Sequence, residues 1–74
     1  MFDYEKIGKR VKETRRRKNM TQAKLAELAD MADASISRIE TGAKQASLES
    51  LAKISRALNI SLDFLVFGTD TNII

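Results

Sequence analysis

Residues 20–42 read MTQAKLAELADMADASISRIETG, and the architecture of the domain can be predicted from this stretch. Its apolar residues recur every three or four positions, as they do on one face of a helix, before and after a break at residues 30–32. Thr21 is typical of a helix N-cap and Gly42 of a left-handed residue that ends a helix. The stretch therefore predicts two short helices, residues 22–29 and 33–41, joined by a three-residue turn.

Two short helices that cross near a right angle through such a turn form a helix-turn-helix unit. The small side chains of Ala26 and Ala29 suit a close approach of the two helices, and Met31 is placed to fill the joint between them. Ile36 and Ile39 are placed to face back onto the first helix of the pair. A generic helical hairpin would show the same pattern, but it would need no particular residues on its outer face.

The start pattern of these helices recurs along the rest of the chain. Asp3, Ser47 and Ser61 are each a cap residue with an apolar residue just before it and another four positions after it. They predict helices over residues 4–18, 48–58 and 62–67, the last two ended by Asn59 and Gly68. We therefore expect an all-α domain of five helices over residues 1–68 and a tail over residues 69–74. The predicted core consists of Ile7, Val11, Met20, Leu25, Ala26, Ala29, Met31, Ile36, Ile39, Leu48, Leu51, Ile54, Leu58, Ile60, Phe64 and Leu65.

Composition excludes several classes of protein. The 74 residues suffice for one domain, and they contain no cysteine and no histidine. The commonest metal ligands and the commonest general base are therefore absent, and no glycine-rich phosphate loop replaces them. No run of apolar residues approaches the roughly 20 that span a bilayer, and the first 18 residues do not form a secretory signal. We expect a cytoplasmic protein that is not an enzyme and needs no metal, cofactor or small-molecule ligand.

The net charge of +3 is unevenly distributed. Residues 1–18 hold eight basic and three acidic residues, a net of +5, whereas residues 19–74 hold five basic and seven acidic residues, a net of −2. A polyanion would therefore be attracted mainly to the first helix. A solvated helix face would carry a similar run of charges, so this feature alone does not assign a function.

A longer pattern is more specific. It consists of Thr21-Gln22-x-x-Leu25-Ala26-x-x-Ala29, then Met31, then Ile36-Ser37-Arg38-Ile39-Glu40-x-Gly42, then Ser47-Leu48-x-x-Leu51 and Ile60-Ser61-Leu62. This pattern resembles the helix-turn-helix family of the phage repressor and Cro proteins, the XRE-like regulators. The resemblance extends over about residues 5–67. It implies a lambda repressor-like DNA-binding domain that regulates transcription, as a repressor that binds a palindromic operator in double-stranded DNA as a homodimer. The half-sites of such an operator lie about 34 Å apart.

The resemblance also implies roles for individual residues. The positions that read base edges in the major groove match Asp33, Ala34, Ser37 and Arg38. Arg38 suits a bidentate contact with guanine, although a phosphate contact or a free surface side chain would also explain it. Gln22 matches a glutamine that binds a phosphate and steadies a side chain of the reading helix; a plain exposed residue at a helix start is the alternative. The other expected phosphate contacts are Thr41, Lys44, Arg16 and Arg17.

Two further roles concern the fold and the assembly. Glu40 matches an acidic position that pairs with an arginine of the first helix, here Arg15, in a structural ion pair. The expected dimer surface is the fifth helix with the tail, through Leu62, Phe67, Ile73 and Ile74. For the two isoleucines, a disordered tip is the alternative.

The sequence departs from the family pattern at the turn. The cap of the reading helix is usually a hydroxyl residue, but here it is Ala32, which should cost about 1 kcal/mol. Asp33 follows, where a neutral or basic reader is more usual. Asp33 could cap the helix itself and start it one residue late, read cytosine N4, or only repel phosphates. Asp30 replaces a common glycine, and aspartate tolerates the left-handed conformation better than most residues.

One alternative function belongs to a different class. An antitoxin or other partner-binding module could use the same fold mainly to hold another protein. It would show an additional apolar face and weak affinity for DNA.

Overall fold

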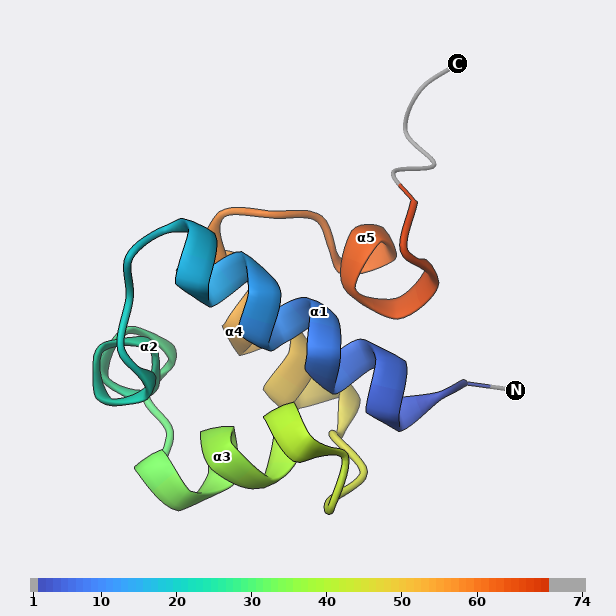
Figure 1. Cartoon of the computed structure of the whole chain (residues 1–74). Helices are drawn as coiled ribbons and strands as arrows, with labels where there is room; N and C mark the ends of the chain where they lie inside the picture. Colours follow the sequence, from blue (N-terminus) through green and yellow to red (C-terminus); the bar gives the residue numbers. More distant parts are fainter. Residues whose placement is uncertain (1, 70–74) are drawn as a thin grey trace.

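The computed structural model describes residues 2–69. Within them the chain forms α1 (Tyr4–Arg17), α2 (Gln22–Ala29), α3 (Asp33–Thr41), α4 (Leu48–Leu58) and α5 (Leu62–Phe67), and no strand (Figure 1). The predicted all-α architecture of five helices is confirmed. Four of the helices have the predicted bounds, and α1 ends one residue earlier than predicted, at Arg17.

The helix starts are set by side-chain caps. Asp3 accepts hydrogen bonds from the N–H groups of Glu5 and Lys6, both at 3.1 Å. The hydroxyl oxygens of Thr21, Ser47 and Ser61 each accept one from the N–H group three residues later, at 3.0 Å. Each of these bonds satisfies an N–H group that has no partner within the helix. α3 differs, because its N-cap is Ala32 and no side chain caps it.

The helix ends are also alike. Asn19, Asp30, Gly42 and Asn59 each take the left-handed conformation just after α1, α2, α3 and α4, with φ between 54° and 79°. In all four cases the next N–H group donates to the carbonyl five residues before it, at 2.9–3.0 Å. This is the Schellman arrangement, which satisfies carbonyl groups at a helix end. It also explains the early end of α1, because the reversal at Asn19 leaves Lys18 as the C-cap.

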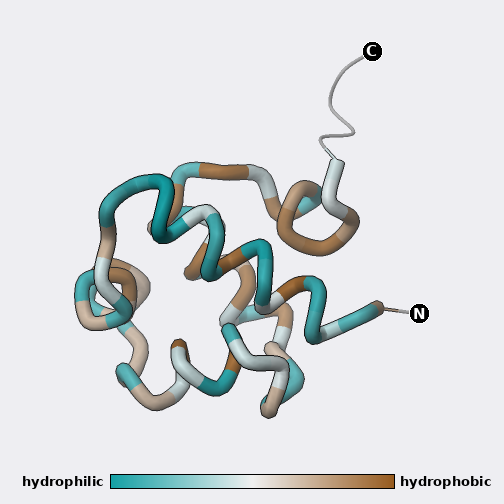
Figure 2. The backbone as a smooth tube through the Cα atoms, in the orientation of Figure 1, coloured by the Kyte–Doolittle hydropathy of each residue, from teal (hydrophilic) through white to brown (hydrophobic). Residues whose placement is uncertain are grey.

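The five helices enclose one apolar core. Its fully buried side chains come from all of them and include Ile7, Val11, Leu25, Ile36, Ile39, Ile54, Leu58 and Leu65. In Figure 2, α1 is mostly hydrophilic with isolated hydrophobic positions, whereas α5 is hydrophobic along most of its length. Leu48 was predicted to be in the core, but it is 71% exposed. It is the first residue of α4, and it borders an apolar hollow that no neighbouring helix covers.

α1 crosses α3 at an unusually short distance. Gly8 is buried in α1, and a Cβ atom added there would lie 2.0 Å from the carbonyl oxygen of Ile39. Only glycine permits this approach, which places the C-terminal half of α3 directly against α1. The crossing therefore fixes the position of the second helix of the predicted helix-turn-helix relative to the rest of the domain.

Candidate nucleic-acid interface

The turn between α2 and α3 has the predicted construction. Asp30 takes the left-handed conformation (φ 54°), and the N–H group of Met31 donates to the carbonyl of Ala26 at 2.9 Å. The side chain of Met31 packs against the core, and Ile36 is fully buried. The inner face of α3 is thereby fixed, and its outer face is left for other contacts.

That outer face carries the four residues expected to read bases. Asp33, Ala34 and Arg38 are exposed, and Ser37 is half-buried. Neither the carboxylate of Asp33 nor the guanidinium of Arg38 has a hydrogen-bond or ion-pair partner among residues 2–69. Asp33 lies in the first turn of α3 and Arg38 in its last. The outer face thus presents a hydrogen-bond acceptor, the Asp33 carboxylate, at one end and the N–H donors of the Arg38 guanidinium toward the other, and both groups are free to bind a ligand.

The structure corrects one interpretation of Asp33. The sequence allowed Asp33 to cap α3 and start it one residue late, but α3 begins at Asp33 itself and Ala32 holds the cap position. Met31 and Ile36 explain this start, because they occupy the positions before the cap and four after it that form a hydrophobic staple. Packing of these two apolar residues sets the first turn, although Ala32 has no oxygen with which to cap it.

The Arg15–Glu40 ion pair joins α1 to α3. The Nε atom of Arg15 lies 2.7 Å from Glu40 Oε2, and its Nη2 atom lies 3.1 Å from Glu40 Oε1. The side chain of Glu40 is only 1% exposed. Arg15 also donates to the carbonyl of Met20 at 2.6 Å, so the same guanidinium holds the loop that leads into α2. The pair therefore connects three segments around the helix-turn-helix.

Gln22 belongs to the same network. Its Nε2 atom donates to Glu40 Oε1 at 2.9 Å, so the amide at the start of α2 is held by a side chain of α3. One N–H of the amide is used by this contact, which leaves the second N–H and the carbonyl oxygen for other partners. The resemblance implied that Gln22 steadies a side chain of the reading helix, and the residue that it contacts is the structural carboxylate Glu40.

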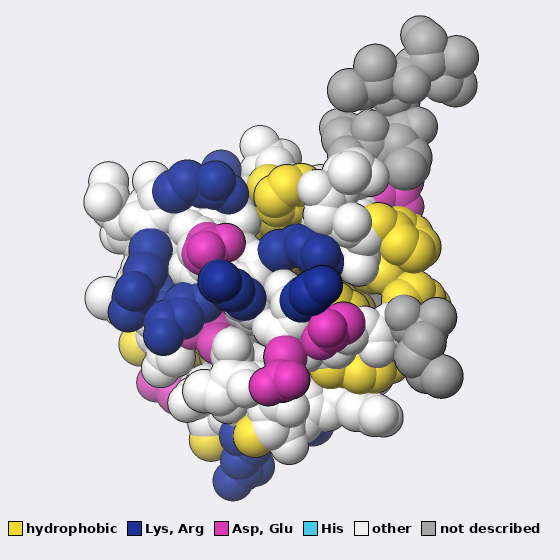
Figure 3. All heavy atoms as spheres, turned by 45° about the vertical axis from the view of Figure 1, so that its right-hand side comes forward, with side chains coloured by type: hydrophobic (Ala, Val, Ile, Leu, Met, Phe, Trp, Pro, Cys, Tyr) yellow, Lys and Arg dark blue, Asp and Glu magenta, His cyan; other side chains and the backbone are white. Residues whose placement is uncertain are grey.

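The expected phosphate contacts lie around this unit. Thr41 and Lys44 are exposed at the end of α3 and in the loop after it, and the Thr41 hydroxyl donates to the carbonyl of Arg38 at 3.2 Å. Arg16 and Arg17 are exposed in the last turn of α1, and four residues separate this helix from α2. Figure 3 shows Lys and Arg side chains gathered on the face in view, with a few acidic side chains between them. Lys44, Arg16 and Arg17 are exposed, so a polyanion can reach them.

Arg10 has a structural role that sequence reasoning missed. It was counted in the positive charge of the first helix, but its Nη1 atom donates to the carbonyls of Leu65 at 2.8 Å and Val66 at 3.1 Å. Carbonyl groups at a helix C-terminus favour a cation. Arg10 therefore holds α5 against α1.

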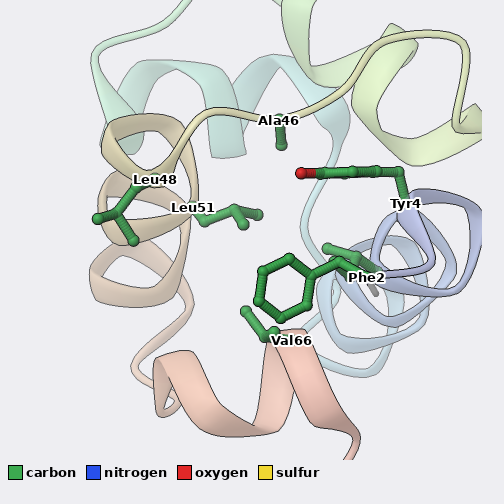
Figure 4. A pocket seen from close by; sticks show the side chains of 7 residues that line it. Phe2, Tyr4, Ala46, Leu48, Leu51 and Val66 are labelled. Atoms are coloured by element: carbon green, nitrogen blue, oxygen red, sulfur yellow. The ribbon is translucent and has the colours of Figure 1, made fainter.

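A second surface is apolar. Phe2, Leu48 and Phe67 are 51%, 71% and 59% exposed. The rings of Phe2 and Phe67 contact each other, with centroids 5.9 Å apart. Beside them is a hollow of about 170 Å³, lined by Phe2, Tyr4, Ile7, Ala46, Leu48, Leu51 and Val66. Figure 4 shows Leu51 pointing from α4 toward Phe2 and Tyr4, whereas Leu48 points away from them.

The residues expected to form a dimer differ in exposure. Phe67 is exposed beside this hollow, whereas Leu62 is half-buried and packs against the core. Ile73 and Ile74 lie outside the described residues.

Two general features complete the description of residues 2–69. No group of three or more acidic, histidine or cysteine side chains there is placed to hold a metal ion. None of the helices in this range is long and apolar enough to cross a membrane.

Comparison with known proteins gives consistent results. The chain matches the helix-turn-helix family over residues 11–65. It is 41% identical over 67 residues to the control protein C.BamHI of Bacillus amyloliquefaciens, an alignment that covers 84% of this chain and 83% of that protein. The crystal structure of the restriction-modification controller protein C.AhdI of Aeromonas hydrophila superposes with a TM-score of 0.83 at 32% identity and covers 85% of this chain and 96% of that one. The P22 c2 repressor, in complex with a synthetic operator, has a TM-score of 0.80 at 28% identity and covers 85% and 96%.

Proposed function

This chain belongs to the helix-turn-helix family, and we propose that it binds double-stranded DNA sequence-specifically and regulates transcription. It acts in the cytoplasm, as a repressor that binds its site as a homodimer. One observation carries the proposal. The outer face of α3 presents free polar side chains, while its inner face is fixed to α1 and α2 by the core and by the Arg15–Glu40–Gln22 network. A rigid helix with an unpaired polar face is what reading of the major groove requires.

Base reading is assigned to Asp33, Ala34, Ser37 and Arg38, the outer residues of α3. Arg38 carries the main contact, because its guanidinium has no partner among the described residues and matches guanine O6 and N7. Ala34 is small enough to let α3 approach the bases and can contact a thymine methyl group. The four residues together read only a few base pairs, and two copies are therefore needed for a specific site.

Phosphate binding is assigned to Gln22, Thr41, Lys44, Arg16 and Arg17. The positive end of α2 and its exposed N–H groups favour a phosphate where Gln22 begins the helix. Glu40 uses one N–H of the Gln22 amide and so fixes the direction of the other. These contacts set the register of the domain on the duplex and carry no sequence information themselves.

We propose the apolar surface formed by Phe2, Leu48 and Phe67 as the place where the second copy binds. A two-fold interface uses the same surface on both subunits, so this surface must fit itself. It carries both projecting side chains, Leu48 and Phe67, and a hollow of about 170 Å³ that can receive one. Leu62 contributes less than the sequence suggested, because it is half-buried.

The central experiment measures binding to random-sequence duplexes at several salt concentrations. We expect selection of a palindromic site and a steep loss of affinity as salt rises. Arg38→Ala should relax the preference at one base of each half-site, whereas Lys44→Ala should weaken all sites and reduce the salt slope by about one. Lys53→Ala is the control, since Lys53 is a cation of α4 that pairs with Glu49 at 3.6 Å.

The same experiment tests the alternative function. An antitoxin or partner-binding module would use the apolar surface for a different protein and would bind DNA weakly. If no duplex binds the chain even at low salt, the DNA-binding proposal fails.

A further inference from the structure

We infer that Asp33 selects cytosine, so each half-site of the bound DNA contains a cytosine that faces the start of α3. This inference rests on the proposed function, and it adds the base recognised by one residue of the reading face. The observation behind it is an exposed carboxylate that the fold itself does not use.

Asp33 has no structural role among residues 2–69. Ala32 occupies the N-cap, so the carboxylate does not start the helix. Within the described part of the chain, its carboxylate accepts no hydrogen bond and takes part in no ion pair. By contrast, Asp3 accepts two backbone hydrogen bonds at the start of α1. The positive end of α3 favours a negative charge at this position, so the helix tolerates Asp33 without needing it.

A carboxylate near DNA must find a donor, because the phosphates around it repel its charge. A carboxylate can only accept hydrogen bonds, and guanine and thymine offer acceptors along their major-groove edges. Two amino groups remain, N4 of cytosine and N6 of adenine. N6 of adenine lies between N7 of the same base and O4 of the paired thymine, both acceptors that would face the second carboxylate oxygen. N4 of cytosine has an acceptor, guanine O6, on only one side, so cytosine is the favoured base.

No side chain next to Asp33 in the sequence could accept the hydrogen bond from N4 of cytosine in its place. Ala32 and Ala34 on either side have no polar side-chain atoms, and both are exposed. Ser37 lies one turn later on the same face and can donate or accept. Arg38 lies nearer the other end of α3 and provides only donors. The face therefore pairs an acceptor for cytosine with donors for guanine, and the two select different bases of the half-site.

The test compares sites selected from random duplexes by the wild-type chain, Asp33→Asn and Asp33→Ala. The wild-type chain should require cytosine at one position of each half-site, and each other base there should weaken binding by at least about fivefold. Asp33→Asn should change that preference to adenine, because an amide pairs with both N6 and N7 of adenine. Asp33→Ala should lose the preference at that position only and keep the preferences elsewhere.

Other outcomes separate two kinds of failure. If Asp33→Ala binds all sites more tightly and keeps the same preferences, Asp33 only repels phosphates and the inference is wrong. The inference is also wrong if Asp33→Asn keeps the cytosine preference. If the wild-type chain selects no site at all, the proposed function itself fails. Circular dichroism of the two variants checks that α3 is still folded, which we expect because the side chain of Asp33 makes no hydrogen bond or ion pair within the described residues.

Discussion

At the residue scale, Glu40 shows how one buried charge can determine the arrangement of a site. Its carboxylate is almost fully buried and accepts hydrogen bonds from Arg15 and from Gln22, which belong to two different helices. A buried charge is stable only when it is paired and hydrogen-bonded. Glu40 therefore holds both Arg15 and Gln22, and the outer face of the helix-turn-helix depends on the contacts of this buried carboxylate.

Removal of Arg15 should destabilise the domain strongly. Arg15→Ala leaves Glu40 buried without its partner and releases the carbonyl of Met20, so we expect a loss of about 3–5 kcal/mol in the free energy of unfolding. Urea denaturation followed by circular dichroism measures it. Arg16→Ala is the matched control, because Arg16 is exposed, and it should change stability by no more than about 0.5 kcal/mol. Equal effects of the two substitutions would show that the ion pair does not stabilise the fold.

Gly8 is the second residue on which the arrangement depends. In Gly8→Ala the new methyl group meets the backbone of Ile39, which cannot move aside as a flexible side chain could. α1 and α3 must separate, and we expect a loss of at least about 1–3 kcal/mol from overpacking. The midpoint of thermal unfolding measures the effect, with Lys9→Ala at the exposed neighbouring position as the control. An unchanged midpoint in Gly8→Ala would contradict the close crossing.

At the scale of the helices, α3 is the helix that begins without a side-chain cap. Ala32 has the extended backbone that an N-cap needs, with φ −75° and ψ 145°, but no side-chain oxygen. Ala32→Ser should therefore stabilise the domain by about 1 kcal/mol, because the new hydroxyl satisfies an N–H group in the first turn of α3. Thr21→Ala, which removes an existing cap from α2, should have the opposite effect. Both are measured by denaturation; a destabilised Ala32→Ser would mean that this N–H group needs no cap.

The helices also show how much the sequence could predict. Caps, staples and left-handed ends act within about six residues, so the bounds of four helices and the end at Gly42 could be predicted from local pattern. Contacts between residues far apart in the sequence could not be predicted from local pattern. Arg10 and Leu65 are 55 positions apart, and a glycine inside a helix does not show by itself what crosses it. The Arg15–Glu40 pair was found only because a family resemblance supplied it.

The start of α3 is an intermediate case. The sequence predicted a helix from residue 33, but it also allowed a start one residue later with Asp33 as the cap, because aspartate is a favourable cap and Ala32 is not. The structure begins the helix by packing instead, through Met31 and Ile36. Where a cap side chain and a hydrophobic staple favour different starts, sequence pattern alone does not decide between them, because the energy of the staple depends on how its two apolar residues pack in the core.

At the scale of the whole molecule, we assign DNA binding and binding of the second copy to two different surfaces. The polar outer face of α3 is assigned to DNA, and the apolar surface of Phe2, Leu48 and Phe67 lies at the starts of α1 and α4 and the end of α5. Because they occupy separate elements, a second copy can bind one surface while the other remains free. This separation allows two reading helices to act on one palindromic site.

Disruption of the apolar surface should therefore weaken dimerisation and leave the fold intact. Leu48→Ser replaces an exposed apolar side chain, so the free energy of unfolding of the monomer should change little, while the dissociation constant of the dimer rises. Phe67→Ser should raise the dissociation constant in the same way, with a decrease of about 0.5–1.5 kcal/mol in monomer stability because its ring contact with Phe2 is lost. Sedimentation equilibrium measures the dimer, and affinity for a palindromic duplex should fall with it, whereas affinity for a single half-site should not. Leu28→Ser is the matched control, because Leu28 is an exposed leucine of α2 that does not line the hollow. If Leu28→Ser weakens the dimer and Leu48→Ser and Phe67→Ser do not, the second copy binds elsewhere and the apolar surface has another partner.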